Sequence, residues 1–215
     1  MTTRVSFEKL ADIYDMDELL DQFSASMRNH SRRVAICSAI ISENANAFMG
    51  FYEIPAGIYL PVIAYLSGIY HDIGKLLLAV DNKDDYYEHP AIGADLLEKN
   101  KAELLGSDAS ALLVLDAVRY HHEQADGGGF PDGRKSRDIP IIAGICSLAD
   151  RLDHYMYPEN TQIGDGTKAF EALEAKVGKQ ICECAWICTE RAWPFLMEKY
   201  DSWNNDENYN EKIRK

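Results

Sequence analysis

Apolar residues recur every three or four positions along most of the chain, which is the spacing of an amphipathic helix. In the segment 30–48, Val34, Cys37 and Ile41 follow this spacing, whereas the segment 60–75 is apolar on nearly all sides and is therefore predicted to be a central helix. Further helical patterns occupy residues 89–100, 107–123, 138–155, 167–178 and 179–193. No alternation of apolar and polar residues is long enough to indicate a strand. The pattern predicts an all-α protein, an irregular helical bundle.

The outer parts of the chain are predicted from the same pattern. Residues 1–27 are predicted to form an N-terminal helical extension, residues 28–200 the main domain, and the polar residues 201–215 a frayed tail. The last helix is predicted to be interrupted near Pro194, because proline lacks a backbone donor and clashes with the preceding turn.

Composition and charge narrow the class of protein. The chain has 215 residues, of which 47% are hydrophobic and 27% charged, as in an ordinary globular domain. It contains no run of about 18 apolar residues and begins without a signal-peptide pattern, so a cytoplasmic protein with no membrane segment is expected. A net charge of −13 argues against general nucleic-acid binding, although bound cations could create a site for a small anionic ligand.

The five cysteines are expected to be reduced thiols, because an odd number in such a chain does not indicate a disulfide framework. Three of them, Cys182, Cys184 and Cys188, lie in a helical pattern beside Trp186 and are predicted to face the core.

His71 and Asp72 lie near the end of the apolar segment 60–75. Burying both groups without partners is costly, and one divalent cation would satisfy both at once. Neighbouring residues on a helix point in different directions, so a shared ion would lie at the end of the helix, where Gly74 relaxes the backbone. A capped helix terminus without metal explains the same residues, and both interpretations stay open at this point.

Residues 121–133 contain two adjacent histidines followed by two acids and three glycines. They could form half of a metal site, or they could be an ordinary helix end that runs into a turn. Glycines allow positive φ and close approach of the backbone to a ligand, so the loop could present N–H groups to a phosphate, but three glycines also occur in simple turns.

The same ligand chemistry recurs at His30, His89 and Asp150. Imidazole nitrogen combined with carboxylate oxygen suits iron, manganese, nickel or zinc, and no cysteine lies in these segments at a zinc-finger spacing. The ligands outnumber those that one ion can use, so two ions bridged by Asp72 are the economical arrangement. Paired ions activate water and hold phosphoryl oxygens.

Several motifs occur together in a characteristic order: HSRRVA, HDIGK, HPAIGADLL, HHE, DGGGFPDG, IP and ADRLD, between about residues 28 and 155. In these motifs the chain resembles the HD-GYP branch of the HD superfamily of metal-dependent phosphohydrolases, whose members are cyclic di-GMP phosphodiesterases. The resemblance implies an HD-domain helical bundle with a metal site in its centre.

The resemblance also implies roles for individual residues. The implied metal ligands are His30, His71, Asp72, His89, His121, His122 and Asp150, with Asp72 as the bridge. Asp72 and Lys75 are the implied catalytic residues, and Lys75 would reach a phosphate oxygen. Asp153 would orient a ligand or a water from behind the metal ligands. The implied substrate loop contains Gly128, Gly129, Phe130, Pro131 and Arg134.

The chain departs from the HD-GYP pattern near the metal site. Phe130 replaces the tyrosine of Gly-Tyr-Pro, which keeps the ring and loses the hydroxyl, and Ala125 replaces a tryptophan. Ser26 stands where members with three metals carry a glutamate, so two ions are favoured. Only 13 residues separate Lys75 from His89, so a flanking helical segment is expected to be missing and the site to be more open.

The largest departure follows Asp153, where the family carries an Arg-Pro-Tyr segment that grips the substrate phosphates and this chain does not. The basic residues that could replace that arginine are Arg134, Lys135, Arg137, Arg151 and Lys168. Two nearby residues have simpler interpretations: Arg33 is expected to form a local salt bridge, and His154 either contacts the site from behind or lies on the surface.

The leading hypothesis is a signalling hydrolase that cleaves cyclic di-GMP with a metal-activated water at a site of two divalent ions, with iron or manganese favoured over nickel and zinc. One alternative is an HD phosphohydrolase with another cyclic dinucleotide or nucleotide as its substrate, motivated by the missing arginine. The other is a non-catalytic receptor or scaffold that contacts a protein partner through residues 129–131.

Overall fold

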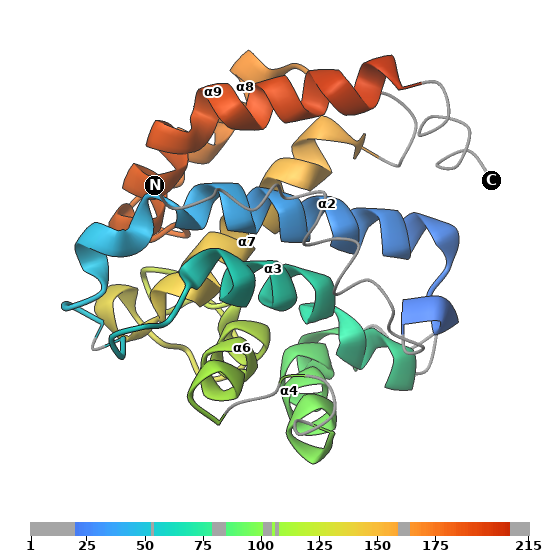
Figure 1. Cartoon of the computed structure of the whole chain (residues 1–215), viewed down its shortest axis with the longest axis vertical. Coiled ribbons are helices and arrows are strands. Elements are labelled where there is room, and N and C mark those ends of the chain that lie inside the picture. Colours follow the sequence, from blue (N-terminus) through green and yellow to red (C-terminus); the bar gives the residue numbers. More distant parts are fainter. Residues whose placement is uncertain are drawn as a thin grey trace.

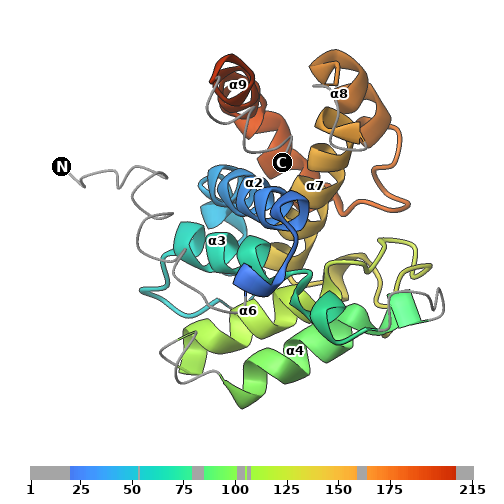
Figure 2. The same ribbon diagram turned by 90° about the vertical axis from the view of Figure 1, so that its right-hand side faces the viewer.

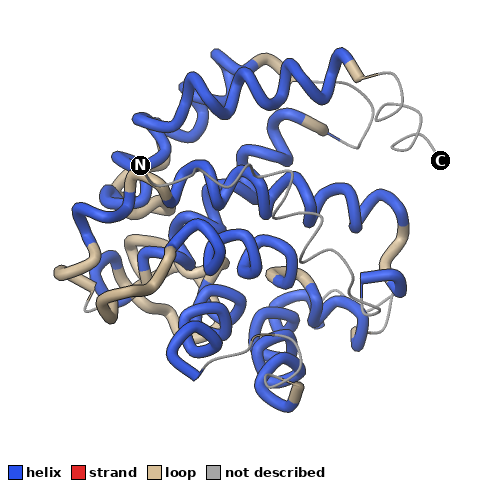
Figure 3. Tube along the Cα trace, in the orientation of Figure 1, coloured by secondary structure: helices blue, strands red, loops and turns tan. Residues whose placement is uncertain are grey.

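The computed structural model describes residues 20–52, 54–78, 85–100, 105, 108–158 and 164–206. Its helices are α2 (Ala25–Ser42), α3 (Leu60–Tyr70), α4 (His89–Lys99), α6 (Asp108–Tyr120), α7 (Ile141–Met156), α8 (Gly166–Glu174) and α9 (Glu183–Asn205). Short 3₁₀ turns are η1 (Leu20–Gln22), η2 (Ala45–Phe48), η3 (Ile73–Leu77), η4 (Asp85–Glu88) and η5 (Ser136–Asp138). No strand occurs within these ranges, so the all-α prediction is confirmed (Figure 3).

Helix α3 is central, as its apolar pattern predicted. Every residue from Leu60 to Tyr70 except Val62 is buried, and the helix packs against α2, α6 and α7. Gly68 lets α2 and α3 approach closely, because a Cβ at this position would lie 2.5 Å from the Cα of Ala35. Each leucine or isoleucine buried in this way contributes about 1.5–3 kcal/mol to folding.

The remaining helices lie on two sides of α2, α3 and α7. Helices α8 and α9 cover one side, and α4 and α6 cover the opposite side (Figures 1 and 2). Helix α7 contacts α2, α3, α6, α8 and α9, so it joins the two sides through the middle of the bundle. The predicted apolar face of α7, formed by Ile142, Ile145, Ala149 and Leu152, is fully buried.

The outer segments differ from the sequence prediction in two places. Helix α9 continues unbroken through Pro194, whose side chain is exposed, whereas Ala192 and Leu196 on either side are buried. The prediction of an interruption was therefore wrong, because the proline ring faces solvent and the packing of its neighbours holds the helix together. The helix also includes residues 201–205, which were predicted to fray, because Trp203 is buried against Tyr200.

The proposed domain boundaries fall inside two helices. Position 28 lies within α2 and position 200 lies within α9. Most of the predicted N-terminal extension, residues 1–19, and the end of the tail, residues 207–215, lie outside the described residues. No described helix is both long and apolar enough to cross a membrane.

All five cysteines are free, in agreement with the expected reduced thiols. Cys182 and Cys188 are buried as predicted, but Cys184 is partly exposed. Burial raises the pKa of Cys37 to about 12, so this thiol is a core group rather than a nucleophile.

Candidate metal centre

The helix that carries His71 and Asp72 ends immediately before them. Helix α3 stops at Tyr70, and the two residues form a turn that leads into η3, with only 1% and 2% of their surfaces exposed. Gly74 allows η3 to lie against α4, because a Cβ there would come within 2.0 Å of the carbonyl oxygen of His89. Its role is therefore close contact between two segments that carry ligands, rather than the relaxed backbone that the sequence suggested.

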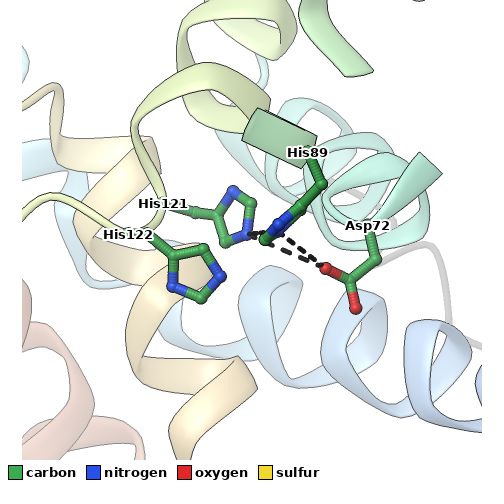
Figure 4. Close-up of side chains that lie close together, drawn as sticks. All are labelled: Asp72, His89, His121 and His122. Atoms are coloured by element: carbon green, nitrogen blue, oxygen red, sulfur yellow. Dashed lines mark hydrogen bonds and ion pairs between the residues drawn. The ribbon is translucent and has the colours of Figure 1, made fainter. Parts of the chain in front are cut away.

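One group of candidate ligands consists of Asp72, His89, His121 and His122, whose ligand atoms lie within 4.8 Å of one another (Figure 4). His89 Nε2 lies 3.2 Å from Asp72 Oδ1 and 3.4 Å from His121 Nε2, and His121 Nε2 lies 4.0 Å from Asp72 Oδ1. The group draws on the end of α3, the start of α4 and the end of α6, so residues 50 positions apart along the chain meet here.

A second group lies on the other side of Asp72. His71 Nε2 lies 3.4 Å from Asp72 Oδ2 and 3.8 Å from Asp150 Oδ1, and His30 Nε2 lies 3.2 Å from the same Asp150 oxygen. His30, His71 and Asp72 also bring their ligand atoms within 4.8 Å of one another. Asp72 thus belongs to both groups, and its two oxygens face opposite ways.

Three of the histidines are oriented by backbone carbonyl groups located three residues earlier in the chain. The Nδ1 atoms of His71, His89 and His121 donate to the carbonyl oxygens of Gly68, Tyr86 and Val118, at 2.8, 2.5 and 2.7 Å. A carbonyl oxygen only accepts, so Nδ1 carries a proton and Nε2 is the atom left to offer a lone pair to a cation. This is the tautomer that a metal ligand needs.

The donor atoms fit a pair of divalent cations. Among the candidate ligands, four buried atoms have no well-aligned hydrogen bond: Nε2 of His30, His71 and His122, and Oδ1 of Asp72. Leaving such groups unpaired is costly, and cations would pair with all of them.

Burial lowers the pKa of His122 to about 3, so its imidazole is neutral and able to bind metal at neutral pH. For Asp72, burial favours the acid, but the surrounding imidazoles and Lys75 outweigh it and hold the pKa well below its usual value.

Metal binding is expected to release a proton from His30. Burial would lower the pKa of His30, but the nearby carboxylates of Asp150 and Asp153 outweigh this and raise it to about 10. Without a bound cation, the imidazole therefore holds a proton at pH 7, and a cation must displace this proton to bind. The affinity of the chain for the cation should therefore rise about tenfold per pH unit below pH 10. Calorimetry in two buffers of different ionisation enthalpy should show about one proton released from this residue, and His30→Gln should lose it. A binding enthalpy that is the same in both buffers would contradict this expectation.

A buried network lies behind His30. Asp153 accepts hydrogen bonds from His30 Nδ1 at 2.7 Å and from Arg33 Nε and Nη2 at 2.6 and 2.8 Å. Tyr200 on α9 donates to the same carboxylate at 3.3 Å. Arg33 was expected to form a local salt bridge, but its partner lies 120 residues further along the chain. The structure places Asp153 where it can orient His30, as the resemblance implied.

Lys75 lies beside the carboxylate that the two groups share. Its Nζ is 2.5 Å from Asp72 Oδ2 and 5.5 Å from the centre of the Tyr86 ring. Burial opposes the charge on the ammonium group, but Asp72 outweighs it and raises the pKa of Lys75.

The glycine-rich loop is organised by Glu123, a residue to which the sequence analysis gave no role. Its buried carboxylate accepts hydrogen bonds from the backbone N–H groups of Asp132 and Arg134, at 2.7 and 2.8 Å. Gly128 N–H donates to Asp126, and Phe130 N–H donates to the carbonyl oxygen of His122. These four N–H groups are therefore occupied by side chains and backbone of the loop and are not presented to a phosphate in this conformation.

The predicted loop residues serve mainly to shape the loop. A Cβ at Gly129 would lie 2.4 Å from the backbone nitrogen of Gln124, so only glycine fits where the loop folds back on itself. The peptide bond between Phe130 and Pro131 is cis. Arg134 stacks on the Tyr120 ring at 3.6 Å and donates to its hydroxyl. The guanidinium group is therefore bound to the last residue of α6, the helix that precedes the loop.

Aromatic side chains border the first ligand group. The Phe130 ring stacks on His122 at 4.7 Å and meets the Tyr87 ring edge-on at 4.9 Å. The Tyr86 ring lies 5.1 Å from His89, and the two tyrosines are 44% and 58% exposed. We call Tyr86, Tyr87 and Phe130 the aromatic border.

The model of the HD domain family matches residues 27–155, more than half of the chain. The chain belongs to the HD domain family. Among curated relatives, the cyclic di-GMP phosphodiesterase of Thermotoga maritima is 26% identical over 184 residues, covering 77% of this chain and 46% of that protein. This HD domain chain thus spans less than half the length of that relative.

Two solved structures share the HD domain fold. One is described as Bd1817, an HDG"Y"P protein from Bdellovibrio bacteriovorus, with a TM-score of 0.54 and 17% identity over 89% of this chain and 57% of that one. The other is the phosphodiesterase PgpH HD domain of L. monocytogenes in complex with cyclic-di-AMP, with a TM-score of 0.53 and 16% identity over 86% and 97%. The family match confirms the HD-domain part of the resemblance drawn from the motifs, the curated relative agrees with it, and the two solved structures share the fold.

The sequence motifs singled out the candidate ligands of this HD domain but missed some of the groups around them. All seven implied ligands lie in the two groups around Asp72 and Asp150. Glu123 and Tyr86 went unassigned, although Glu123 directly follows the paired histidines and could have been recognised as the acid that supports the next loop. The assignment of the seven residues as metal ligands is part of the proposal below.

Proposed function

We propose that the chain is a metal-dependent phosphodiesterase that hydrolyses a cyclic dinucleotide, most simply cyclic di-GMP. The observation that carries this proposal is the position of Asp72, whose two oxygens face two separate sets of histidines. The residues that would hold two ions are His30, His71, Asp72, His89, His121, His122 and Asp150, with iron or manganese favoured. When bound, such ions activate water and neutralise phosphoryl oxygens.

The residues of the chain would position a phosphate next to these ligands. In the metal-free arrangement the Lys75 ammonium group is paired with Asp72 Oδ2. If the carboxylate bound cations, that pair would weaken and Lys75 would be available to a phosphoryl oxygen, where it would stabilise the charge that develops during cleavage. Asp153 and Arg33 would hold His30 in place while the reaction proceeds.

The missing Arg-Pro-Tyr segment supports a second candidate, hydrolysis of a different cyclic dinucleotide. Arg134, the nearest substitute in the loop, is bound to Tyr120 and the carbonyl oxygen of Asp138, which leaves the phosphate grip to Lys75 and the ions. Recognition would then depend more on the bases than on an arginine clamp. The substrate therefore has to be determined with a panel rather than assumed.

The experiment is a turnover assay combined with metal analysis on one anaerobically purified sample loaded with Fe(II) or Mn(II). Cyclic di-GMP, cyclic di-AMP, the mixed cyclic dinucleotide and nucleoside monophosphates are offered separately. We expect two ions per chain and hydrolysis of at least one cyclic dinucleotide. Two bound ions with no cleavage of any of them would contradict the proposal, and a chain that binds no metal would favour the receptor interpretation.

The aromatic border is expected to bind a base of the substrate. Stacking of a base on an aromatic ring is worth about 1–3 kcal/mol, so Tyr87→Ala should raise KM about tenfold and leave kcat nearly unchanged. Steady-state kinetics on the best substrate of the panel would measure both constants. Tyr59→Ala is a matched control, because Tyr59 is similarly exposed and precedes α3 at its N-terminal end. Equal KM values in the two variants would exclude a stacking role for Tyr87.

A further inference from the structure

His154 is the one histidine that the family motifs leave without a role. It lies on the last turn of α7, four residues after Asp150, and its side chain is 69% exposed. An imidazole so exposed needs no protein partner, because water can satisfy both nitrogens. Yet its Nε2 lies 3.2 Å from Asp150 Oδ1, and its ring centre lies 4.9 Å from that of His30. The side chain thus turns toward the metal centre.

Three ligand atoms converge at this position. His30, Asp150 and His154 each offer one atom, and all lie within 4.8 Å of one another. His30 Nε2 is buried, has no well-aligned hydrogen bond and lies 3.2 Å from Asp150 Oδ1, so it points to the same space. Its other nitrogen, Nδ1, is already bound to Asp153. Nε2 is therefore the only atom of His30 that can bind a cation here.

The geometry points to His154 as an additional ligand of the ion that His30 and Asp150 would hold. One imidazole nitrogen binds one ion, so the set with His154 and the set with His71 and Asp72 describe the same ion, approached from two sides. His71 and Asp72 approach it from the buried side, and His154 approaches it from the exposed side. This inference rests on the proposed metal-dependent function.

The exposure of His154 suggests how such a ligand behaves. Its partners are nearly inaccessible to solvent, whereas its own side chain is held by one contact with Asp150 and by ring packing on His30. A ligand held so loosely can leave the ion without disturbing the fold. It would strengthen the retention of this ion.

The test compares Mn(II) binding to the wild-type chain, His154→Ala and His154→Gln, measured by chelator competition and by the electron paramagnetic resonance signal of free Mn(II). Glutamine can still donate a hydrogen bond to Asp150 but is a poor metal ligand. We expect two ions on the wild type, and in both variants one ion bound as before and the other at least tenfold more weakly. Arg151→Ala is the control on the same helix, because Arg151 faces Ser147 and Gln180.

The outcomes separate ligation from simple positioning. Normal binding in His154→Gln with weak binding in His154→Ala would show that His154 only orients Asp150 and would overturn the inference. Normal binding of both ions in both variants would overturn it as well. In either case two ions on the wild type would leave the proposed function standing, whereas a wild type that binds no Mn(II), Fe(II) or Zn(II) would contradict both. Circular dichroism spectra would identify a variant that fails to fold.

Discussion

Replacing Asp72 with alanine is expected to abolish metal binding and hydrolysis together. The side chain supplies one oxygen to each ligand group, with Oδ1 next to His89 and Oδ2 next to His71, so its loss weakens both ion positions at once. We expect turnover to fall at least about a thousandfold, which corresponds to about 4 kcal/mol of transition-state stabilisation. Metal content and initial rates of the same sample would measure both effects.

The design needs a control for charge and a control for folding. Asp72→Asn keeps the shape of the side chain and removes its charge, and it should lose the same functions. Asp95→Ala is the matched control, since Asp95 is an exposed carboxylate on α4, the helix that begins with the ligand His89. An Asp72→Ala chain that turns over at the wild-type rate would eliminate the metal mechanism, whatever the substrate.

Replacing Arg33 with methionine is expected to cause the largest loss of stability. Arg33 is only 1% exposed and binds both oxygens of Asp153, so its removal leaves a buried carboxylate that keeps hydrogen bonds from His30 and Tyr200 but has lost its guanidinium partner. Breaking one side of a buried ion pair costs about 3–5 kcal/mol. Urea unfolding of the metal-free chain would measure the change in the free energy of unfolding.

A double variant tests whether the cost comes from the unpaired charge. Arg33→Met combined with Asp153→Leu removes both charges and should recover part of the stability lost in the single variant. Arg137→Met, a substitution at an exposed position in η5, should change stability by less than about 0.5 kcal/mol. A loss below about 1 kcal/mol in Arg33→Met would show that this ion pair does little to stabilise the fold.

The sequence singled out the candidate ligands that the structure brings together, because most of them lie at points that periodicity can locate. His71 and Asp72 end an apolar helix, His89 begins one, His121 follows one, and Asp150 lies on the polar side of a strongly patterned one. Helix packing then brings these positions together, so a correct set of helices places the candidate ligands near one another. The bridging position of Asp72 came from the resemblance and from counting ligands, rather than from the helix pattern.

The sequence was less informative where a side chain binds a backbone group that is distant along the chain. Nothing in the pattern shows that Glu123 meets the N–H groups of residues 132 and 134, because this depends on how the loop reverses. The same holds for Arg33, whose partner was expected nearby. Pro194 was misjudged because its effect depends on which side of α9 it faces.

The hydroxyl group of Tyr200 connects the candidate metal centre to a helix that lies outside the sequence motifs. The family match ends at residue 155, but Tyr200 on α9 donates to the carboxylate that orients His30 and accepts from Cys37 on α2. A fragment trimmed to the matched region would keep every implied ligand and lose one wall of the bundle, exposing the side of α7 that α8 and α9 cover. The smallest piece of this chain suited to biochemical work therefore extends to the end of α9.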